Sequence, residues 1–112
     1  MSDWAQKKCQ PCHGGTAALT QAQADGYLKE VAGWQMSPEG KQIERTYVCK
    51  DFRDALRFAN QIGEIAESED HHPNLCIFAY KRLRIELSTH AIGGLSENDF
   101  ILAGKINQIR NL

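Results

Sequence analysis

The chain has 112 residues, of which 42% are hydrophobic and 24% are charged, and its formal net charge is −1. This length suits one domain with a single core, and the charge balance argues against a nucleic-acid-binding surface, which needs clustered basic residues. No apolar stretch is long enough for a transmembrane helix, and the N-terminus lacks the apolar segment of a signal peptide. We therefore expect a cytoplasmic protein whose four cysteines stay reduced.

Residues 1–18 are predicted to form an irregular N-terminal arm, because they are mostly polar and contain two adjacent glycines. The arm carries Cys9-x-x-Cys12 followed by His13, which is formally the attachment pattern of c-type haem. Haem attachment requires export, which this sequence does not indicate. Zinc would need a fourth ligand from one of the two remaining cysteines. The simplest interpretation is a pair of exposed thiols on a flexible arm.

Residues 19–112 are predicted to fold as a single α+β domain. A first helix should begin after Thr20, because Thr20 and Gln23 have the spacing of a capping box. A β-hairpin is expected next, with strands at Trp34–Ser37 and Lys41–Cys49 joined by a Pro-Glu-Gly turn. The second of these strands alternates between its two faces with a period of two, as a half-buried strand does.

Asp51 is predicted to cap a second helix, which should reach about Glu67. Pro73 cannot continue a helix and disfavours helical backbone at the residue before it, so the helix has to end upstream. Apolar residues at helical spacing predict one buried stripe on this helix. The stripe consists of Phe52, Ala55, Ala59, Ile62 and Ala66.

A second hairpin is expected from strands at Asn74–Tyr80 and Leu83–Ser88, with the turn at Lys81–Arg82. The first of these strands is apolar on both faces, which indicates a central strand or one that is covered in an oligomer. A last helix should begin after Ser96, with Asp99 at the N3 position of a capping box. The order helix, two strands, helix, two strands, helix predicts a four-stranded antiparallel sheet with three helices on one face.

Three of the four histidines lie in a short window of the sequence, at positions 71, 72 and 90. If the second hairpin is tight, His72 and His90 lie at the same edge of the sheet, because the start of one strand lies beside the end of its partner. Taken singly, each histidine has a structural interpretation, at a helix C-terminus or on a surface loop. Together they suit proton transfer, since imidazole titrates near neutral pH.

Other chemistries fit this window less well. Zinc could be held by the three histidines with Glu67 or Asp70, but the spacing of a helical zinc motif is missing. A covalent route would need a nucleophile, and Ser88 on an extended strand points away from the adjacent side chains. Asp99 has two interpretations that stay open, as a helix cap or as part of the site.

The spacing of these residues closely resembles the signature of the pterin-4a-carbinolamine dehydratases. Further segments that resemble this family are VAGW, which ends at Trp34, LSTH at residues 87–90 and GLSENDF at residues 94–100. The resemblance spans Leu19–Ile109, most of the chain. The spaced signature consists of Glu67, His71, His72, Pro73, Tyr80, His90 and Asp99.

The resemblance implies a hydro-lyase that uses neither a metal nor a bound cofactor. Members of this family dehydrate 4a-hydroxytetrahydropterin, the by-product of aromatic amino acid hydroxylases, to quinonoid dihydropterin. By resemblance, the catalytic acid/base set is His71, His72 and His90. By resemblance, the substrate-binding residues are Asp70, Ser88, Thr89 and Trp34, and the supporting residues are Glu67 and Asp99.

The resemblance also implies a homodimer or homotetramer, with an aromatic amino acid hydroxylase as a candidate partner and no direct contact with nucleic acid. Animal members of the family also act as a dimerisation cofactor of a homeodomain transcription factor. One alternative function is therefore a non-catalytic module that binds a pterin, including a molybdopterin-related one, or stabilises a partner. The presence of all three histidines favours the enzyme. A thiol-based metal or redox protein built on the arm is the third alternative.

Overall fold

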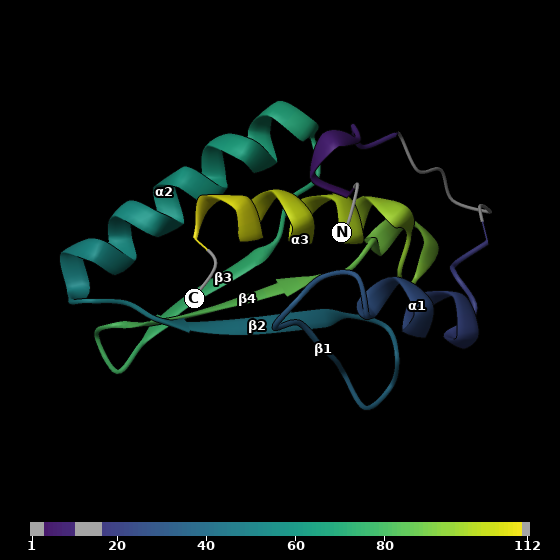
Figure 1. The fold of residues 1–112 in the computed structure, drawn as a ribbon, viewed down its shortest axis with the longest axis horizontal. Helices are drawn as coiled ribbons and strands as arrows, with labels where there is room; N and C mark the ends of the chain where they lie inside the picture. Colours follow the sequence, from purple (N-terminus) through teal and green to yellow (C-terminus); the bar gives the residue numbers. More distant parts are fainter. Residues whose placement is uncertain (1–3, 11–16, 111–112) are drawn as a thin grey trace.

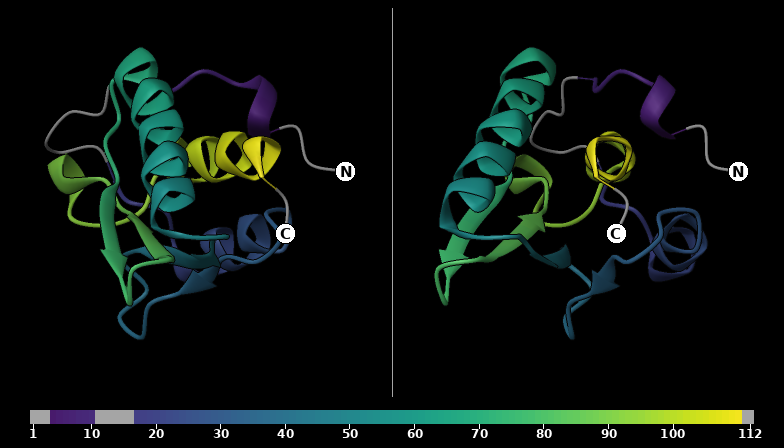
Figure 2. Two further views of the ribbon diagram at one scale, coloured as in Figure 1. Left: turned by 90° about the vertical axis from the view of Figure 1, so that its left-hand side faces the viewer. Right: turned by 60° about the vertical axis from the view of Figure 1, so that its left-hand side comes forward.

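Helices and strands follow one another in the predicted order in a computed structural model, which describes residues 4–10 and 17–110 (Figure 1). The four strands form one antiparallel sheet in the order β1-β2-β4-β3. The three α-helices lie on one face of this sheet (Figure 2), which confirms the predicted α+β class. The elements are η1 (Trp4–Gln6), α1 (Gln21–Leu28), β1 (Gln35–Met36), β2 (Ile43–Val48), α2 (Phe52–Glu69), β3 (Asn74–Phe78), β4 (Arg82–Leu87), η2 (His90–Ile92) and α3 (Glu97–Ile109).

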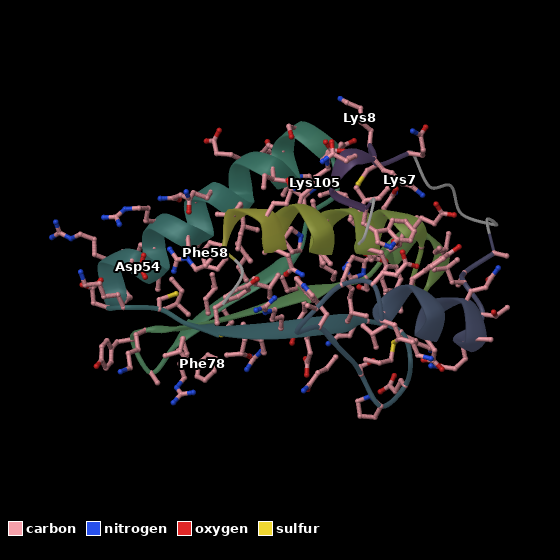
Figure 3. The ribbon with its side chains drawn as sticks, in the orientation of Figure 1. Lys7, Lys8, Asp54, Phe58, Phe78 and Lys105 are labelled. Carbon is pink, nitrogen blue, oxygen red and sulfur yellow. The ribbon has the colours of Figure 1, made fainter. Side chains whose placement is uncertain are left out.

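The core lies between the sheet and the helices. Strand β4 places its alternate residues Leu83, Ile85 and Leu87 on the covered face, and all three are fully buried. Helix α2 contributes Phe58 from above, and Figure 3 shows this ring pointing from the helix toward the sheet. Phe78 of β3 points to the opposite face of the sheet in the same view. One face of the sheet is therefore covered and the other is open.

Local capping signals begin the helices where the sequence predicts. The Thr20 side chain accepts a hydrogen bond from the backbone of Gln23, and the reciprocal bond completes the capping box of α1. Ser96 and Asp99 form the same motif at α3. Asp51 caps α2 by accepting a hydrogen bond from the backbone N–H of Asp54 at 2.8 Å. Each cap satisfies backbone donors that the first helical turn leaves unpaired.

Helix α2 continues to Glu69, two residues beyond its predicted end. It stops because Asp70 adopts a left-handed backbone, with φ 52° and ψ 42°, and its N–H bonds back to the carbonyls of Ala66 and Glu67. Phe52 is 50% exposed, so its predicted place in the buried stripe is wrong, whereas Ala55, Ile62 and Ala66 are buried as predicted. In the part of the chain that the structure describes, no helix has the length and hydropathy needed to cross a bilayer.

Strand β3 lies at the edge of the sheet, which excludes the first of its two predicted positions, a central strand, and leaves the second, a strand covered in an oligomer, as a prediction. The turn of this hairpin also differs from the prediction, because Ala79 and Tyr80 have positive φ angles of 47° and 53° and β4 already begins at Arg82. Left-handed turn residues match the right-handed twist of paired strands. Within residues 4–10 and 17–110, no strand pairs with the outer edge of β3.

Residues 4–10, which we call the arm segment, pack against the domain. Trp4 is buried and contacts the rings of Tyr27 and Phe100, with centroid distances of 4.8 and 5.9 Å. The Lys105 ammonium donates a hydrogen bond of 2.9 Å to the carbonyl of Ala5. The predicted flexible arm is therefore wrong for this segment, because a large aromatic side chain anchors it. Cys12 and His13 lie outside the described residues.

Candidate active site

A pocket of about 420 Å³ opens where α2 ends, β4 ends and α3 begins. We call it the histidine pocket, because His71, His72 and His90 all line it. The antiparallel pairing of β3 with β4 produces this arrangement, since it places the residues before β3 beside the residues after β4. Its walls are residues 69–72, residues 88–91, Asn98 of α3, and Cys9 and Gln10 of the arm segment.

His71 is held by a buried carboxylate. Its Nε2 lies 2.7 Å from Oδ1 of Asp99, whose side chain is fully buried. The other carboxylate oxygen of Asp99 accepts hydrogen bonds from the Thr89 hydroxyl at 2.9 Å and from the Ser96 N–H at 3.0 Å. Asp99 therefore has both of the roles considered from the sequence: it caps α3 and it binds His71. An ionised Asp99 orients the ring and stabilises an imidazolium there.

The other two histidines are in contact with solvent. Nε2 of His72 lies 2.5 Å from Oε2 of Glu67, and these side chains are 55% and 79% exposed. Water screens a pair so exposed, so this bond mainly orients the His72 ring. His90 is exposed at the start of η2. The histidine pocket thus combines one mostly buried, carboxylate-bound imidazole with two that are exposed to solvent.

Of the substrate-binding residues implied by the resemblance, three line the histidine pocket and one does not. Asp70 and Ser88 line the histidine pocket, and Thr89 lines it while its hydroxyl bonds to Asp99. Trp34, the residue before β1, is buried, and its Nε1 donates a hydrogen bond of 2.9 Å to Oδ1 of Asn107 in α3. Trp34 is not among the residues that line the histidine pocket. Its position supports the core beside the first hairpin.

Sequence reasoning missed the contribution of the arm segment and of Asn98. The backbone N–H of Cys9 donates to Glu69 at 2.8 Å, and Asn98 bonds to the backbone of Gln10. Burial and the neighbouring Glu69 carboxylate raise the pKa of the Cys9 thiol to about 12, so the thiol stays protonated at neutral pH. The available signal was Trp4, a large apolar residue in an otherwise polar stretch.

The geometry of the described residues does not assemble a metal site. Among residues 4–10 and 17–110, no group of three or more histidine, cysteine or acidic side chains converges on one point. His71 and His72 instead each bond to a separate carboxylate. The arrangement favours proton transfer to and from a ligand in the pocket.

Comparison with known proteins identifies the family. Residues 17–109 match the family model described as pterin 4 alpha carbinolamine dehydratase. The chain belongs to this family. The resemblance seen in the sequence is thereby confirmed, and the prediction of a hydro-lyase is confirmed because the family is one of dehydratases.

Relatives of this dehydratase family cover nearly the whole chain. Pterin-4-alpha-carbinolamine dehydratase 2, a mitochondrial protein of Arabidopsis thaliana, is 42% identical over 98% of this chain and 60% of its own length. A relative from Azoarcus sp. (strain BH72), assigned to the same dehydratases, is 40% identical over 97% of this chain and 92% of its own. The crystal structure of a transcriptional coactivator/pterin dehydratase from Brucella melitensis superimposes with a TM-score of 0.77 and 36% identity. That match covers 82% of this chain and 97% of the Brucella chain.

Proposed function

We propose that this protein dehydrates 4a-hydroxytetrahydropterin to quinonoid dihydropterin by histidine acid/base catalysis. The observation that carries the proposal is the bond between His71, which is mostly buried, and the fully buried Asp99 at the wall of the histidine pocket, with His72 and His90 lining the same pocket. Membership of the dehydratase family supports the choice of substrate. The reaction serves to recycle the pterin cofactor of aromatic amino acid hydroxylases.

The reaction needs one proton delivered and one removed. The bond between C4a and the hydroxyl oxygen breaks as an acid protonates that oxygen, so the hydroxyl leaves as water. A base takes the proton from N5, and the electron pair of the N–H bond forms the C4a=N5 double bond. We assign the base role to His71, because Asp99 stabilises the imidazolium that forms there. His72 and His90 are the candidates for the acid, since both contact solvent that can reprotonate them.

The remaining pocket residues are suited to binding rather than proton transfer. Asp70 and Ser88 present a carboxylate and a hydroxyl to the histidine pocket, and both can bond to the amino and amide groups of a pterin ring. Thr89 acts through Asp99, because its hydroxyl bonds to that carboxylate. We propose no binding role for Trp34, which lies in the core away from this pocket.

The test is a stopped-flow assay with substrate generated in place by a phenylalanine hydroxylase. The quantity measured is the rate of quinonoid dihydropterin formation above the spontaneous rate. We expect a rate enhancement that saturates with substrate and is lost in His71→Ala. An exposed residue far from the pocket, Gln108→Ala, is the matched control and should keep wild-type turnover. A folded wild-type protein without any enhancement would contradict the proposal.

A second candidate function is a partner-stabilising oligomeric module. The Brucella protein is described as a transcriptional coactivator as well as a pterin dehydratase, and β3 lies at an edge of the sheet in this chain. Its apolar residues Leu75 and Phe78 are 38% and 37% exposed, and Tyr80 in the adjoining turn is 61% exposed. We propose that a second copy pairs along this edge to form a homodimer or homotetramer. Light scattering that shows only monomers at micromolar concentration would contradict it.

We propose the cytoplasm as the place of action and a hydroxylase as a further partner. The three cysteines in the described part of the chain are free thiols, as a reducing compartment requires. Gel filtration with a phenylalanine hydroxylase tests the partnership. A shared peak supports it, and separate peaks at tens of micromolar of each protein contradict it.

A further inference from the structure

We propose that the arm segment forms a wall of the substrate pocket, where Cys9 and Gln10 contact the bound pterin. This inference rests on the proposed dehydratase function. The family model matches residues 17–109, so it assigns no role to the arm segment. Three features of the structure carry the inference: the anchor at Trp4, the bonds made by Cys9 and Gln10, and the elements that these bonds connect.

The arm segment is anchored firmly enough to serve as a wall. Trp4 is 4% exposed and packs among aromatic rings of α1 and α3. Gly104 of α3 allows this close approach, because a Cβ atom there would lie 2.9 Å from the backbone nitrogen of Ala5. Lys105 fixes the same point by donating to the Ala5 carbonyl. The segment therefore leaves this anchor from a fixed point, and Cys9 and Gln10 at its other end line the histidine pocket.

At its other end the arm segment is bonded to the pocket itself. The Cys9 N–H donates to Oε1 of Glu69 at 2.8 Å. Asn98 makes a paired contact with Gln10: its Oδ1 accepts from the Gln10 N–H at 2.9 Å, and its Nδ2 donates to the Gln10 carbonyl at 2.6 Å. Such a two-bond contact fixes both the position and the orientation of the backbone.

These bonds connect the two elements that hold the buried histidine. Glu69 lies two residues before His71, and Asn98 lies one residue before Asp99. The arm segment therefore bridges the end of α2 and the start of α3 beside the bond that joins His71 to Asp99. Both Cys9 and Gln10 line the histidine pocket as a result. A ligand that fills this pocket has to meet them.

The chemistry of this wall indicates binding rather than proton transfer. Gln10 carries a neutral amide, and the half-buried thiol of Cys9, next to the Glu69 carboxylate, stays protonated at neutral pH. Neither group adds a charge opposite the three histidines. We therefore expect the wall to act on the affinity for the pterin and to leave the chemical step nearly unchanged.

Kinetics of three arm variants provide the first test. Gln10→Ala and Cys9→Ala should each raise KM roughly threefold to tenfold while kcat stays within about twofold, because they remove binding contacts only. Lys8→Ala is the matched control: it lies in the same segment, does not line the pocket, and points away from the domain in Figure 3. Lys8→Ala should leave both KM and kcat at their wild-type values. Unchanged KM in Gln10→Ala and Cys9→Ala, with active wild-type protein, would overturn the inference and leave the dehydratase function standing.

Hydrogen exchange gives a readout that does not depend on turnover. The probe is 7,8-dihydrobiopterin, which lacks the 4a hydroxyl and cannot react. Its addition should slow backbone exchange in the peptide that covers residues 4–10 by at least about threefold, because the ligand covers Cys9 and Gln10. Slower exchange at residues 69–72 without any change in the arm peptide would show binding away from the arm and overturn the inference. If wild-type protein neither turns over nor binds this pterin, the dehydratase function fails, and the inference fails with it.

Discussion

Asp99 bonds with its two carboxylate oxygens to two different parts of the molecule, and His71 is the partner on one side. The other oxygen closes the capping box of α3 and accepts the Thr89 hydroxyl. One buried side chain thereby links the start of α3, Thr89 just beyond the end of β4, and the proposed catalytic base. The position of His71 is coupled to the start of α3 by this carboxylate.

Replacement of this carboxylate by an amide should separate its two roles. Asp99→Asn keeps the side-chain shape but cannot stabilise an imidazolium on His71, so we expect kcat to fall roughly 10²–10³-fold. Ser96→Ala is the matched control: it removes the helix cap and should cost about 1 kcal/mol of unfolding free energy while turnover stays within about threefold. Stopped-flow turnover and urea unfolding measure the two effects. Wild-type turnover in Asp99→Asn would remove His71–Asp99 from the mechanism.

The exposed pair of His72 and Glu67 should respond differently. Because both side chains are more than half exposed, the loss of the Glu67 charge is screened by water. Glu67→Gln should therefore change kcat by less than about threefold. His72→Ala should lower kcat by roughly 10²-fold if His72 is the acid, and His90→Ala should do so if His90 is. The comparison assigns the acid, and full activity of both histidine variants would exclude the two candidates.

The pair of Asp54 and Arg110 should control stability in acid. Arg110 donates two hydrogen bonds to Asp54, at 2.8 and 3.0 Å, and these bonds with the Lys50 N–H hold the pKa of Asp54 below its usual value. A lowered folded-state pKa adds stability above the unfolded pKa near 3.9, and this stability is lost as the pH falls through the folded value. Asp54→Asn should lower the unfolding free energy by about 1 kcal/mol at pH 7, with a smaller difference below pH ~3.

Urea unfolding at several pH values measures this effect, and Arg57→Ala serves as its control. Arg57 also faces Asp54, but its nitrogen is 3.9 Å away and its side chain is 64% exposed. Its removal should therefore leave the unfolding free energy within about 0.5 kcal/mol of wild type. Equal effects of the two substitutions would mean that the bidentate geometry of Arg110 contributes nothing.

The thiol of Cys9 should react slowly with alkylating reagents. Its raised pKa of about 12 leaves little thiolate at pH 8, so alkylation by iodoacetamide should be roughly 10³-fold slower than for an unstructured cysteine peptide. Peptide-resolved mass spectrometry of timed samples measures this rate at Cys9 separately from the other cysteines. In urea the rate should rise to that of the peptide. A fast reaction in the native protein would mean that the thiol is not shielded as the structure shows.

Local signals in the sequence were sufficient to predict most of the fold. The caps at Thr20, Asp51 and Ser96 form as predicted, because each depends only on residues within three positions. The edge position of β3 could not be predicted this way, since strand order depends on pairing between distant segments. The positive φ angle of Ala79 could not be predicted either, because alanine rarely adopts this conformation and its presence gives no signal for it.

The candidate site also has features that the sequence could predict and features that it could not. The meeting of His72 and His90 follows from the pairing of neighbouring strands, so the sequence was enough to expect it. The bond from His71 to Asp99 and the contacts of Cys9 span 28 and 60 residues or more, and no local pattern encodes them. Trp34, which the family resemblance adds to the binding residues, lies in the core and bonds to Asn107, so a binding role for it stays an untested prediction.

Two glycine substitutions should show how strongly the arm segment depends on its anchor. Gly104→Ala places a methyl group 2.9 Å from the Ala5 nitrogen and from Cβ of Trp4, so the arm segment has to move. We expect a loss of about 1–3 kcal/mol of unfolding free energy and a red shift in tryptophan fluorescence as Trp4 becomes exposed. Gly63→Ala is the matched control in α2, because no atom lies within 4 Å of its added Cβ. It should gain about 0.5–1 kcal/mol through helix propensity alone.

The same pair of variants connects the anchor to the pocket. If Trp4 positions the wall that Cys9 and Gln10 form, Gly104→Ala should also raise KM for the pterin, by roughly the factor seen for Gln10→Ala. Gly63→Ala should leave KM unchanged, since it lies on α2 away from the pocket lining. A lower stability without any change in KM would show that the anchor supports the core alone and that the wall holds its position through Glu69 and Asn98.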